Sequence, residues 1–94
     1  MLKMGILGMG KMGELHAKWI NANENLKLVA ICDKDILRLE LYKKKYAVPA
    51  FTDVNEFLSQ DDIDFVVIVT TNEVHEKLTV MTLKAGKNVI VKNQ

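Results

Sequence analysis

Residues 8–13 read GMGKMG, within the opening stretch MLKMGILGMGKMGELHAKWI of residues 1–20. The first, third and sixth positions of this segment are glycine, which is the pattern G-x-G-x-x-G. A short apolar run from Leu2 to Leu7 ends at the first glycine and predicts a β-strand. Beyond it, apolar residues recur at helical spacing, at Met12, Leu15, Trp19 and Ile20. The glycines are therefore predicted to form the turn between a strand and a helix.

An acidic residue follows a second predicted strand. Residues 26–32, LKLVAIC, predict this strand, and Asp33 comes directly after it, twenty residues beyond Gly13. Strand, glycine turn, helix, strand and acid in this order make up the dinucleotide-binding fingerprint. In that fingerprint Gly8 allows the tight turn, Gly10 lets the backbone approach a diphosphate, and Gly13 lets the helix pack closely on the strand.

The start of the first helix and Asp33 would hold different parts of a dinucleotide. The helix begins near Lys11 and Met12, and its unpaired N–H groups and dipole favour a nearby anion by ~0.3–1 kcal/mol. The Asp33 carboxylate would accept hydrogen bonds from the adenosine ribose hydroxyls. The alternative is that the glycines form an ordinary turn and Asp33 is a surface acid.

The residues around Asp33 also bear on the choice of cofactor. A carboxylate at this position repels the 2′-phosphate of NADP, which favours NAD. Lys34 is adjacent and would offset that repulsion. The sequence therefore favours NAD and leaves NADP possible.

The rest of the chain continues the alternation of strands and helices. Three more strands are predicted, at residues 49–51, 64–69 and 88–91. Helices are predicted from Asp35 to Tyr46, from Val54 to Leu58, and from Glu73 to Ala85 after an N-cap at Asn72. Asp53 and Glu56 have the spacing of a capping box, and Gly86 suits a left-handed helix end.

This alternation predicts an α/β fold of the Rossmann type, a doubly wound parallel sheet of about five strands with helices on both faces. Right-handed crossovers favour the strand order 3-2-1-4-5. The inner side of the second helix is expected to carry Ile36, Leu39 and Tyr46, and Trp19 is expected to pack its helix on the sheet.

Length and composition narrow the possible functions. The 94 residues suffice for one domain, and a net charge of +1 gives no attraction for nucleic acid or an anionic membrane. No apolar run approaches the ~20 residues that span a bilayer, and no signal peptide is evident. The single cysteine, Cys32, suits a reducing compartment and is expected to be inert core, so a cytoplasmic location is expected.

Five ordered segments resemble the N-terminal domain of the Gfo/Idh/MocA (glucose–fructose oxidoreductase / inositol 2-dehydrogenase) family. These segments are GILGMGKMGELHAKW, LKLVAICDKD, YAVPAFTDVNEFL, IDFVVIVTTNEVH and LKAGKNVIV. The resemblance implies NAD(P)-linked oxidation or reduction of a sugar, polyol or similar small alcohol. It also implies that the segment after the fourth strand, Thr70-Thr71-Asn72, borders the cofactor, and that His75 lies near its nicotinamide end.

The motif and the resemblance together give one set of candidate cofactor-binding residues: Gly8, Gly10, Lys11, Met12, Gly13, Asp33, Lys34, Thr70, Thr71, Asn72 and His75.

The chain departs from the family pattern in two places. Proline is usual where this chain has Thr71. The family usually reads Glu-Lys-Pro after the fifth strand, with a catalytic lysine, whereas the positions here are Lys92, Asn93 and Gln94 and the lysine falls on Asn93. We therefore expect residues 1–94 to be a dinucleotide-binding domain without the family's C-terminal substrate domain, catalytically incomplete and with no catalytic residue of its own. The alternatives are a non-catalytic NAD-sensing or regulatory module and a truncated scaffold fragment.

Other polar residues are expected to be structural. His16 and His75 lie on different helices without Cys or Glu at metal-ligand spacing, so no metal site is predicted. Residues 43–45 (KKK) are expected to be a solvated helix end, and Asp61, Asp62 and Asp64 to be turn residues. The fifth strand is expected to be an open edge. Self-association is predicted through that edge or through the face that would meet the missing domain.

Overall fold

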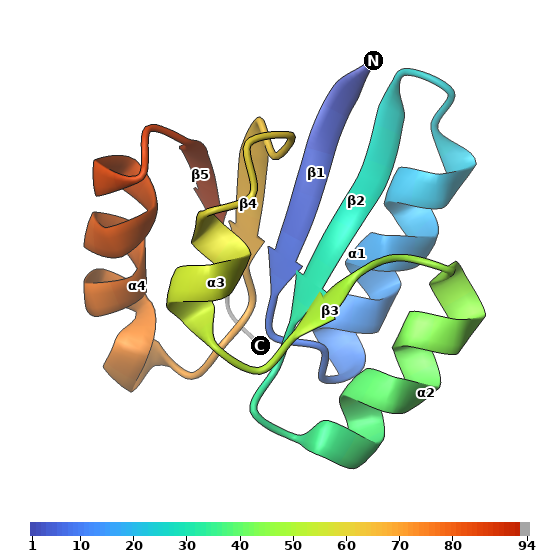
Figure 1. The fold of residues 1–94 in the computed structure, drawn as a ribbon, viewed down its shortest axis with the longest axis horizontal. Helices are drawn as coiled ribbons and strands as arrows, with labels where there is room; N and C mark the ends of the chain where they lie inside the picture. Colours follow the sequence, from blue (N-terminus) through green and yellow to red (C-terminus); the bar gives the residue numbers. More distant parts are fainter. Residues whose placement is uncertain (93–94) are drawn as a thin grey trace.

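The computed structural model describes residues 1–92 and contains one parallel sheet of five strands in the order β3-β2-β1-β4-β5. This confirms the predicted fold class and strand order (Figure 1). Asn93, the position on which the family's catalytic lysine falls, lies outside the described residues. The strands are β1 (Leu2–Leu7), β2 (Leu26–Cys32), β3 (Ala50–Phe51), β4 (Phe65–Ile68) and β5 (Asn88–Val91).

Four helices connect these strands and cover both faces of the sheet, as expected for right-handed crossovers. One core cluster joins the sheet to α1 and α2 and includes Ile6, Met9 and Ile31. The other joins it to α3 and α4 and includes Phe57, Ile68 and Leu78. The helices are α1 (Lys11–Ala22), α2 (Ile36–Tyr46), α3 (Val54–Leu58) and α4 (Asn72–Lys84).

The strand register brings the functional segments to one edge of the sheet. Leu7, the last residue of β1, is paired with Cys32 on β2 and with Ile68 on β4. The loops after these three strands therefore begin at the same level. These loops carry the glycine turn, Asp33 and Thr70, so segments far apart in the sequence meet at the C-terminal edge.

Polar residues and a glycine set the helix ends. Asp35 and Asp53 are N-caps, accepting hydrogen bonds from the backbone N–H of Arg38 and of Asn55, each at 3.1 Å. Gly86 follows α4 with φ +80°, the left-handed conformation expected for it. The prediction for the start of α4 was wrong by one residue, because Thr71 occupies the N-cap position and makes no side-chain cap bond.

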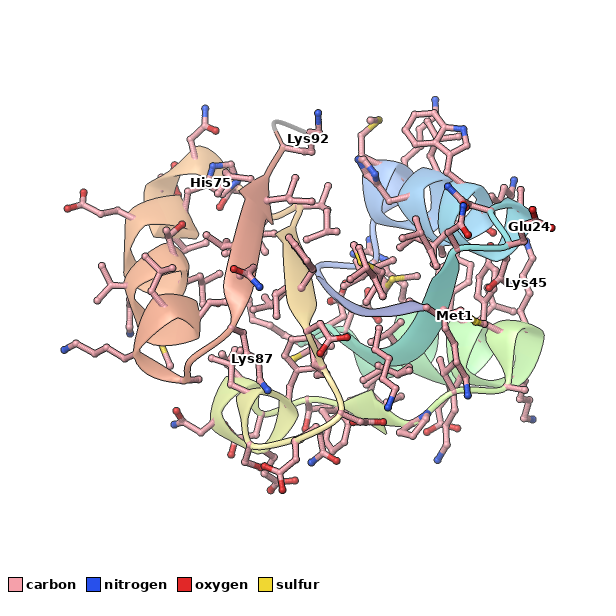
Figure 2. The ribbon with its side chains drawn as sticks, turned by 90° about the horizontal axis from the view of Figure 1, so that it is seen from above. Met1, Glu24, Lys45, His75, Lys87 and Lys92 are labelled. Atoms are coloured by element: carbon pink, nitrogen blue, oxygen red, sulfur yellow. The ribbon has the colours of Figure 1, made fainter. Side chains whose placement is uncertain are left out.

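Several packing expectations were wrong. Trp19 is 54% exposed and stands edge-on to His16 instead of packing on the sheet, and Ile36 is 63% exposed. Lys45 is not merely solvated, because it forms an ion pair with Glu14 on α1. Lys87, just beyond the end of α4, is buried and points toward α3 (Figure 2). Its Nζ donates to the carbonyl oxygens that follow α3, those of Gln60 at 2.6 Å and Ile63 at 3.2 Å.

Within residues 1–92, no helix has the length and apolar character needed to cross a membrane. The same residues contain no cluster of His, Cys, Asp or Glu side chains that could hold a metal ion.

Candidate functional site

The glycine turn is folded tightly against its neighbours. Gly8 has φ +108°, and a Cβ atom there would lie 2.5 Å from the carbonyl oxygen of Val69. A Cβ atom on Gly13 would collide with the carbonyl oxygen of Gly8. These two positions therefore require glycine for the backbone path itself, because any side chain would push the loop away from β4 or from α1.

Asp33 is joined directly to this turn. Its Oδ2 accepts a hydrogen bond from the backbone N–H of Met9 at 2.7 Å, and its Oδ1 accepts one from the backbone N–H of Asp35 at 2.9 Å. The guanidinium of Arg38 lies 3.4 Å from Oδ2. The Asp33 side chain is only 10% exposed. Since two carboxylate oxygens offer about four acceptor positions, some capacity remains for a ligand hydroxyl.

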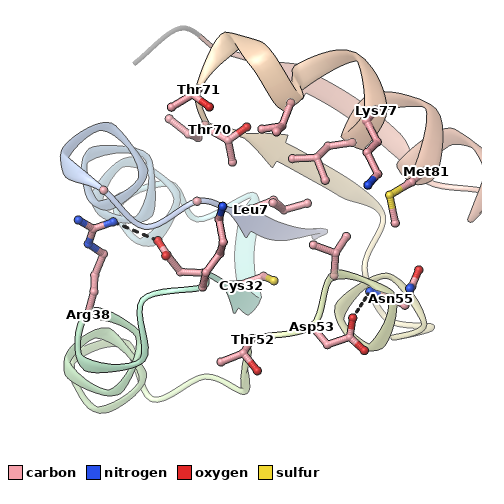
Figure 3. A pocket seen from close by; sticks show the side chains of 18 residues that line it. Leu7, Cys32, Arg38, Thr52, Asp53, Asn55, Thr70, Thr71, Lys77 and Met81 are labelled. Atoms are coloured by element: carbon pink, nitrogen blue, oxygen red, sulfur yellow. Dashed lines mark hydrogen bonds and ion pairs between the residues drawn. The ribbon is translucent and has the colours of Figure 1, made fainter.

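A cavity of about 560 Å³ opens at this edge of the sheet (Figure 3). One wall is apolar and comes largely from α4, with Val74, Leu78 and Met81. The opposite side is polar and carries residues from the ends of β2 and β3. An apolar wall with a few convergent polar groups suits a nucleoside. The predicted residues that line the cavity are Gly8, Gly10, Asp33, Lys34, Thr70 and Thr71.

The other predicted residues lie around the cavity without lining it. Gly13 is buried beneath the turn, Met12 is half-buried against the core, and Lys11 and Asn72 are exposed at the first residues of α1 and α4. His75 makes a 2.6 Å hydrogen bond between its Nε2 and the carbonyl oxygen of Thr70. Because a carbonyl oxygen only accepts, Nε2 carries the hydrogen, and His75 ties the loop after β4 to α4.

Two helices present their N-termini at this edge without side-chain caps. The first N–H groups of α1 have no partner within the helix. The hydroxyl oxygen of Thr70 is buried and has no hydrogen-bond partner. Unsatisfied donors and an orphaned hydroxyl beside an apolar wall fit a dinucleotide, which carries a diphosphate, hydroxyls and an aromatic base.

Some lining residues were missed by the sequence analysis. Arg38 comes from the first turn of α2, while Lys77 points from α4 into the cavity. Both residues are far from the glycine turn in the sequence, so no motif links them to it. They reach the same cavity only because the parallel strands end at the same edge of the sheet. The signal for Arg38 was its position five residues after Asp33, near the start of a helix that begins beside that carboxylate. The remaining missed polar residues are Thr52, Asp53 and Asn55.

The sequence model of a protein family described as "Oxidoreductase family, NAD-binding Rossmann fold" (GFO_IDH_MocA) matches residues 2–92. The chain belongs to the Gfo/Idh/MocA family. It is the N-terminal, NAD-binding Rossmann domain of that family, as its sequence pattern predicted.

Known members of the Gfo/Idh/MocA family show the same relationship. The chain is 33% identical to an inositol 2-dehydrogenase of Salmonella typhimurium in an alignment 91 residues long, which covers 94% of this chain and 27% of that protein. A probable dehydrogenase from Thermotoga maritima superposes with a TM-score of 0.92 at 30% identity, over 96% of this chain and 27% of that one. GenD2 from gentamicin A biosynthesis, solved in complex with NAD, superposes with a TM-score of 0.91 at 29% identity, over 96% of this chain and 26% of that one. This Gfo/Idh/MocA chain therefore spans about a quarter of the length of these relatives.

Proposed function

We propose that this chain binds NAD along the C-terminal edge of its sheet, as the cofactor domain of an oxidoreductase that acts on a sugar, polyol or similar small alcohol. The diphosphate would lie over Gly8 and Gly10, against the backbone N–H groups of Lys11, Met12 and Gly13. Asp33 would hold the adenine-side ribose, with Lys34 beside it. The loop Thr70-Thr71-Asn72 and His75 would border the nicotinamide half of the cofactor.

The observation that carries this proposal is the 2.7 Å hydrogen bond from the Met9 N–H to the Asp33 carboxylate. This bond connects Asp33, which is proposed to hold the ribose, directly to the glycine turn, which is proposed to hold the diphosphate. The spacing between two cofactor subsites is thereby fixed by the chain itself. Neither an ordinary turn nor a surface acid requires that connection.

The residues of this chain have binding and positioning roles in the proposal. A bound nicotinamide supplies a hydride acceptor or donor. The N–H groups of the turn hold negative charge, Asp33 orients the ribose, and His75 fixes the Thr70 carbonyl so that the loop keeps its shape. The apolar wall of α4 excludes water from the base.

We assign no catalytic residue to this chain. Hydride transfer requires a substrate held near attack distance and a group that moves the hydroxyl proton. The relatives are several times longer, and those named inositol 2-dehydrogenase suggest a cyclic polyol as the substrate class. By itself the chain is expected to bind NAD and to leave myo-inositol unoxidised.

Calorimetric titration with NAD tests the proposal through Gly10→Ala. Gly10 has φ −72°, which alanine adopts freely, so the variant should fold while its methyl group obstructs the diphosphate. We expect NAD affinity to fall by about ten-fold or more, with an unchanged melting temperature in the absence of NAD. Asn21→Ala, at the exposed far end of α1, is the matched control and should bind NAD like the parent chain.

A folded parent chain that shows no NAD binding at millimolar concentration would overturn the proposal and favour a scaffold that has lost its ligand. Equal NAD affinity of the parent and Gly10→Ala chains would also count against it, because the diphosphate would then lie elsewhere.

We further propose that the chain self-associates through the β5 edge and the adjoining face on the α1 side. Ile90 and Val91 are 37% and 41% exposed, and β5 pairs only with β4 among the described strands. Trp19 and Leu2, about half exposed, belong to the same side. An open edge strand with apolar side chains readily pairs with a second copy.

A further inference from the structure

The outer edge of β5 presents backbone groups with which no described strand pairs. The N–H groups of Asn88 and Lys92 donate toward β4, to carbonyl oxygens at 3.1 Å and 3.0 Å. Because successive residues of a strand direct their N–H and C=O groups to opposite sides, Val89 and Val91 direct theirs away from β4. These two residues therefore supply the hydrogen-bond donors and acceptors of the open edge.

Two identical edges satisfy one another when the strands run antiparallel. In an antiparallel pair, residues that lie directly opposite exchange both of their hydrogen bonds, so the two strands contribute equally. In a parallel pair the bonds are slanted and the two strands differ in role, which a two-fold symmetric contact does not allow. The other edge of the sheet, β3, is only two residues long and is too short to pair with the whole of β5.

We propose that two copies of this chain pair their β5 strands antiparallel, in a register centred on Ile90, and so form one continuous sheet. This inference rests on the self-association proposed above. It adds the orientation of the second copy and the residues that meet across the contact.

The side chains of β5 select this register. With Ile90 at the centre, Val89 lies opposite Val91 of the second copy, so the outward N–H and C=O groups of both residues are paired. Ile90 then lies opposite Ile90 of the second copy, in a pair without hydrogen bonds, where side chains approach most closely. This contact covers a side chain that is 37% exposed in the single chain. Centring on Val89 or Val91 instead places Ile90 opposite a polar residue, Asn88 or Lys92.

The charges along the strand agree with the antiparallel direction. Lys92 lies opposite Asn88 of the second copy, whose side-chain oxygen can accept a hydrogen bond from the ammonium group. The Asp64 carboxylate lies at this same end, because the Asp64 carbonyl oxygen accepts the N–H of Asn88. The Lys92 side chains of the two copies are about 13 Å apart along the strand direction. A parallel pair brings them together at one end, where like charges repel.

This arrangement leaves both proposed NAD sites open. Antiparallel strands direct the C-terminal edges of the two copies to opposite ends of the combined sheet. The cavity and the glycine turn of each copy therefore do not face those of the other copy. We expect the dissociation constant of the dimer to agree within about three-fold with and without NAD, because neither event covers the site of the other.

Disulfide formation between copies tests the register, at a concentration at which the parent chain associates. Cys32 is buried, so a cysteine introduced on the edge is the accessible thiol. Opposite residues of an antiparallel pair lie within the Cα distance that a disulfide allows. We expect Ile90→Cys to form a covalent dimer under mild oxidation, with about five-fold or more the yield of Leu37→Cys. Leu37 is the matched control, because it is 85% exposed on α2, at the other end of the sheet from β5 (Figure 1).

A pair of variants tests the direction of the strands. Asn88→Cys and Lys92→Cys lie opposite one another only when the strands are antiparallel. Each variant alone should therefore remain uncross-linked, since a disulfide cannot join Cα atoms more than about 7 Å apart. An equimolar mixture of the two variants should give a covalent dimer that a reducing agent separates. In a parallel pair the pattern is reversed, because each cysteine then lies beside the same residue of the second copy.

The outcomes separate this inference from the self-association on which it rests. If the parent chain associates while Ile90→Cys cross-links no better than Leu37→Cys, the register is wrong and the self-association stands. The same holds if Asn88→Cys cross-links with itself, or if NAD changes the dissociation constant by more than about three-fold. A parent chain that is strictly monomeric at high concentration overturns both proposals.

Discussion

Cys32 and Asp33 are neighbours at the end of β2 and differ completely in their chemistry. The Cys32 thiol is 1% exposed within the apolar cluster against α3 and α4. Burial, together with the smaller effect of the negative charges of Asp33 and Asp53, raises its pKa to about 12. The predicted burial of Cys32 is confirmed. Because the thiolate is the reactive form of cysteine, we expect Cys32 to be inert in the folded chain.

We predict that Cys32 does not react with Ellman's reagent in the native protein. At pH 8 about one molecule in ten thousand carries the thiolate, and the reagent cannot reach it. In guanidinium chloride the single thiol should react fully. A rapid reaction of the native protein at pH 8 would contradict both the burial and the raised pKa.

At the scale of elements, Glu14 connects α1 to α2. Its carboxylate forms an ion pair with Lys45 and accepts hydrogen bonds from the hydroxyls of Tyr42 at 3.3 Å and Tyr46 at 3.2 Å. The hydrogen bond from Lys45 lowers the pKa of Glu14 below its ordinary value of 4.5. The same contact raises the pKa of Lys45. The end of α2 is thereby held against the helix that follows the glycine turn.

We predict that Glu14→Gln is less stable than the parent at pH 7 and that this difference disappears in acid. A lowered pKa in the folded state stabilises the fold at pH values above 4.5. That contribution to stability is lost as the pH falls through the lowered pKa that Glu14 has in the folded state. The measurement is the free energy of unfolding in urea between pH 7 and pH 2.5. Glu40→Gln, a substitution at an exposed position of α2, should show no such convergence.

Local sequence signals were sufficient for the elements but not for their partners. The apolar runs, the Asp35 and Asp53 caps and Gly86 predicted the strands and helices, because these features depend on neighbouring residues. The strand order followed from the handedness of the crossovers. The exposure of Trp19 and the buried hydrogen bonds of Lys87 were missed. They depend on which distant backbone segment lies opposite each side chain.

The candidate site shows the same division. The glycine turn and Asp33 were identified as parts of a known fingerprint, and the structure joins them through the Met9 N–H. Arg38 and Lys77 carry no motif and become part of the cavity only because α2 and α4 both begin at this edge. Periodicity places such residues on a helix but does not say which cavity that helix borders.

At the scale of the whole molecule, the two faces of the sheet differ in how well they are covered. Helix α4 packs beside β5 on one face, whereas Ile90 faces the α1 side, opposite Val67, and remains partly exposed (Figures 1 and 2). Trp19 on α1 and Leu2 on β1 are also exposed, so several apolar side chains remain uncovered besides the open strand edge. Exposed apolar side chains that gather on one surface mark sites of protein association.

We predict that the parent chain shows concentration-dependent association in sedimentation equilibrium and that Ile90→Lys reduces it. A lysine on an edge strand opposes pairing with another strand. Leu37→Lys introduces the same charge at a leucine that is 85% exposed on α2, and it should leave association unchanged. A strictly monomeric parent at high concentration would contradict the proposal, as would equal effects of the two variants.

The contact of Gly13 beneath Gly8 and the hold of Asp33 on Met9 have a consequence for ligand entry. The turn is restrained from below by a helix and from the side by a carboxylate, so its backbone path is already fixed when no nucleotide is near. The conformational entropy of ordering this loop is lost during folding instead of during ligand capture. Because this anion-binding turn is already ordered, the main remaining free-energy cost of binding is the removal of water from the diphosphate.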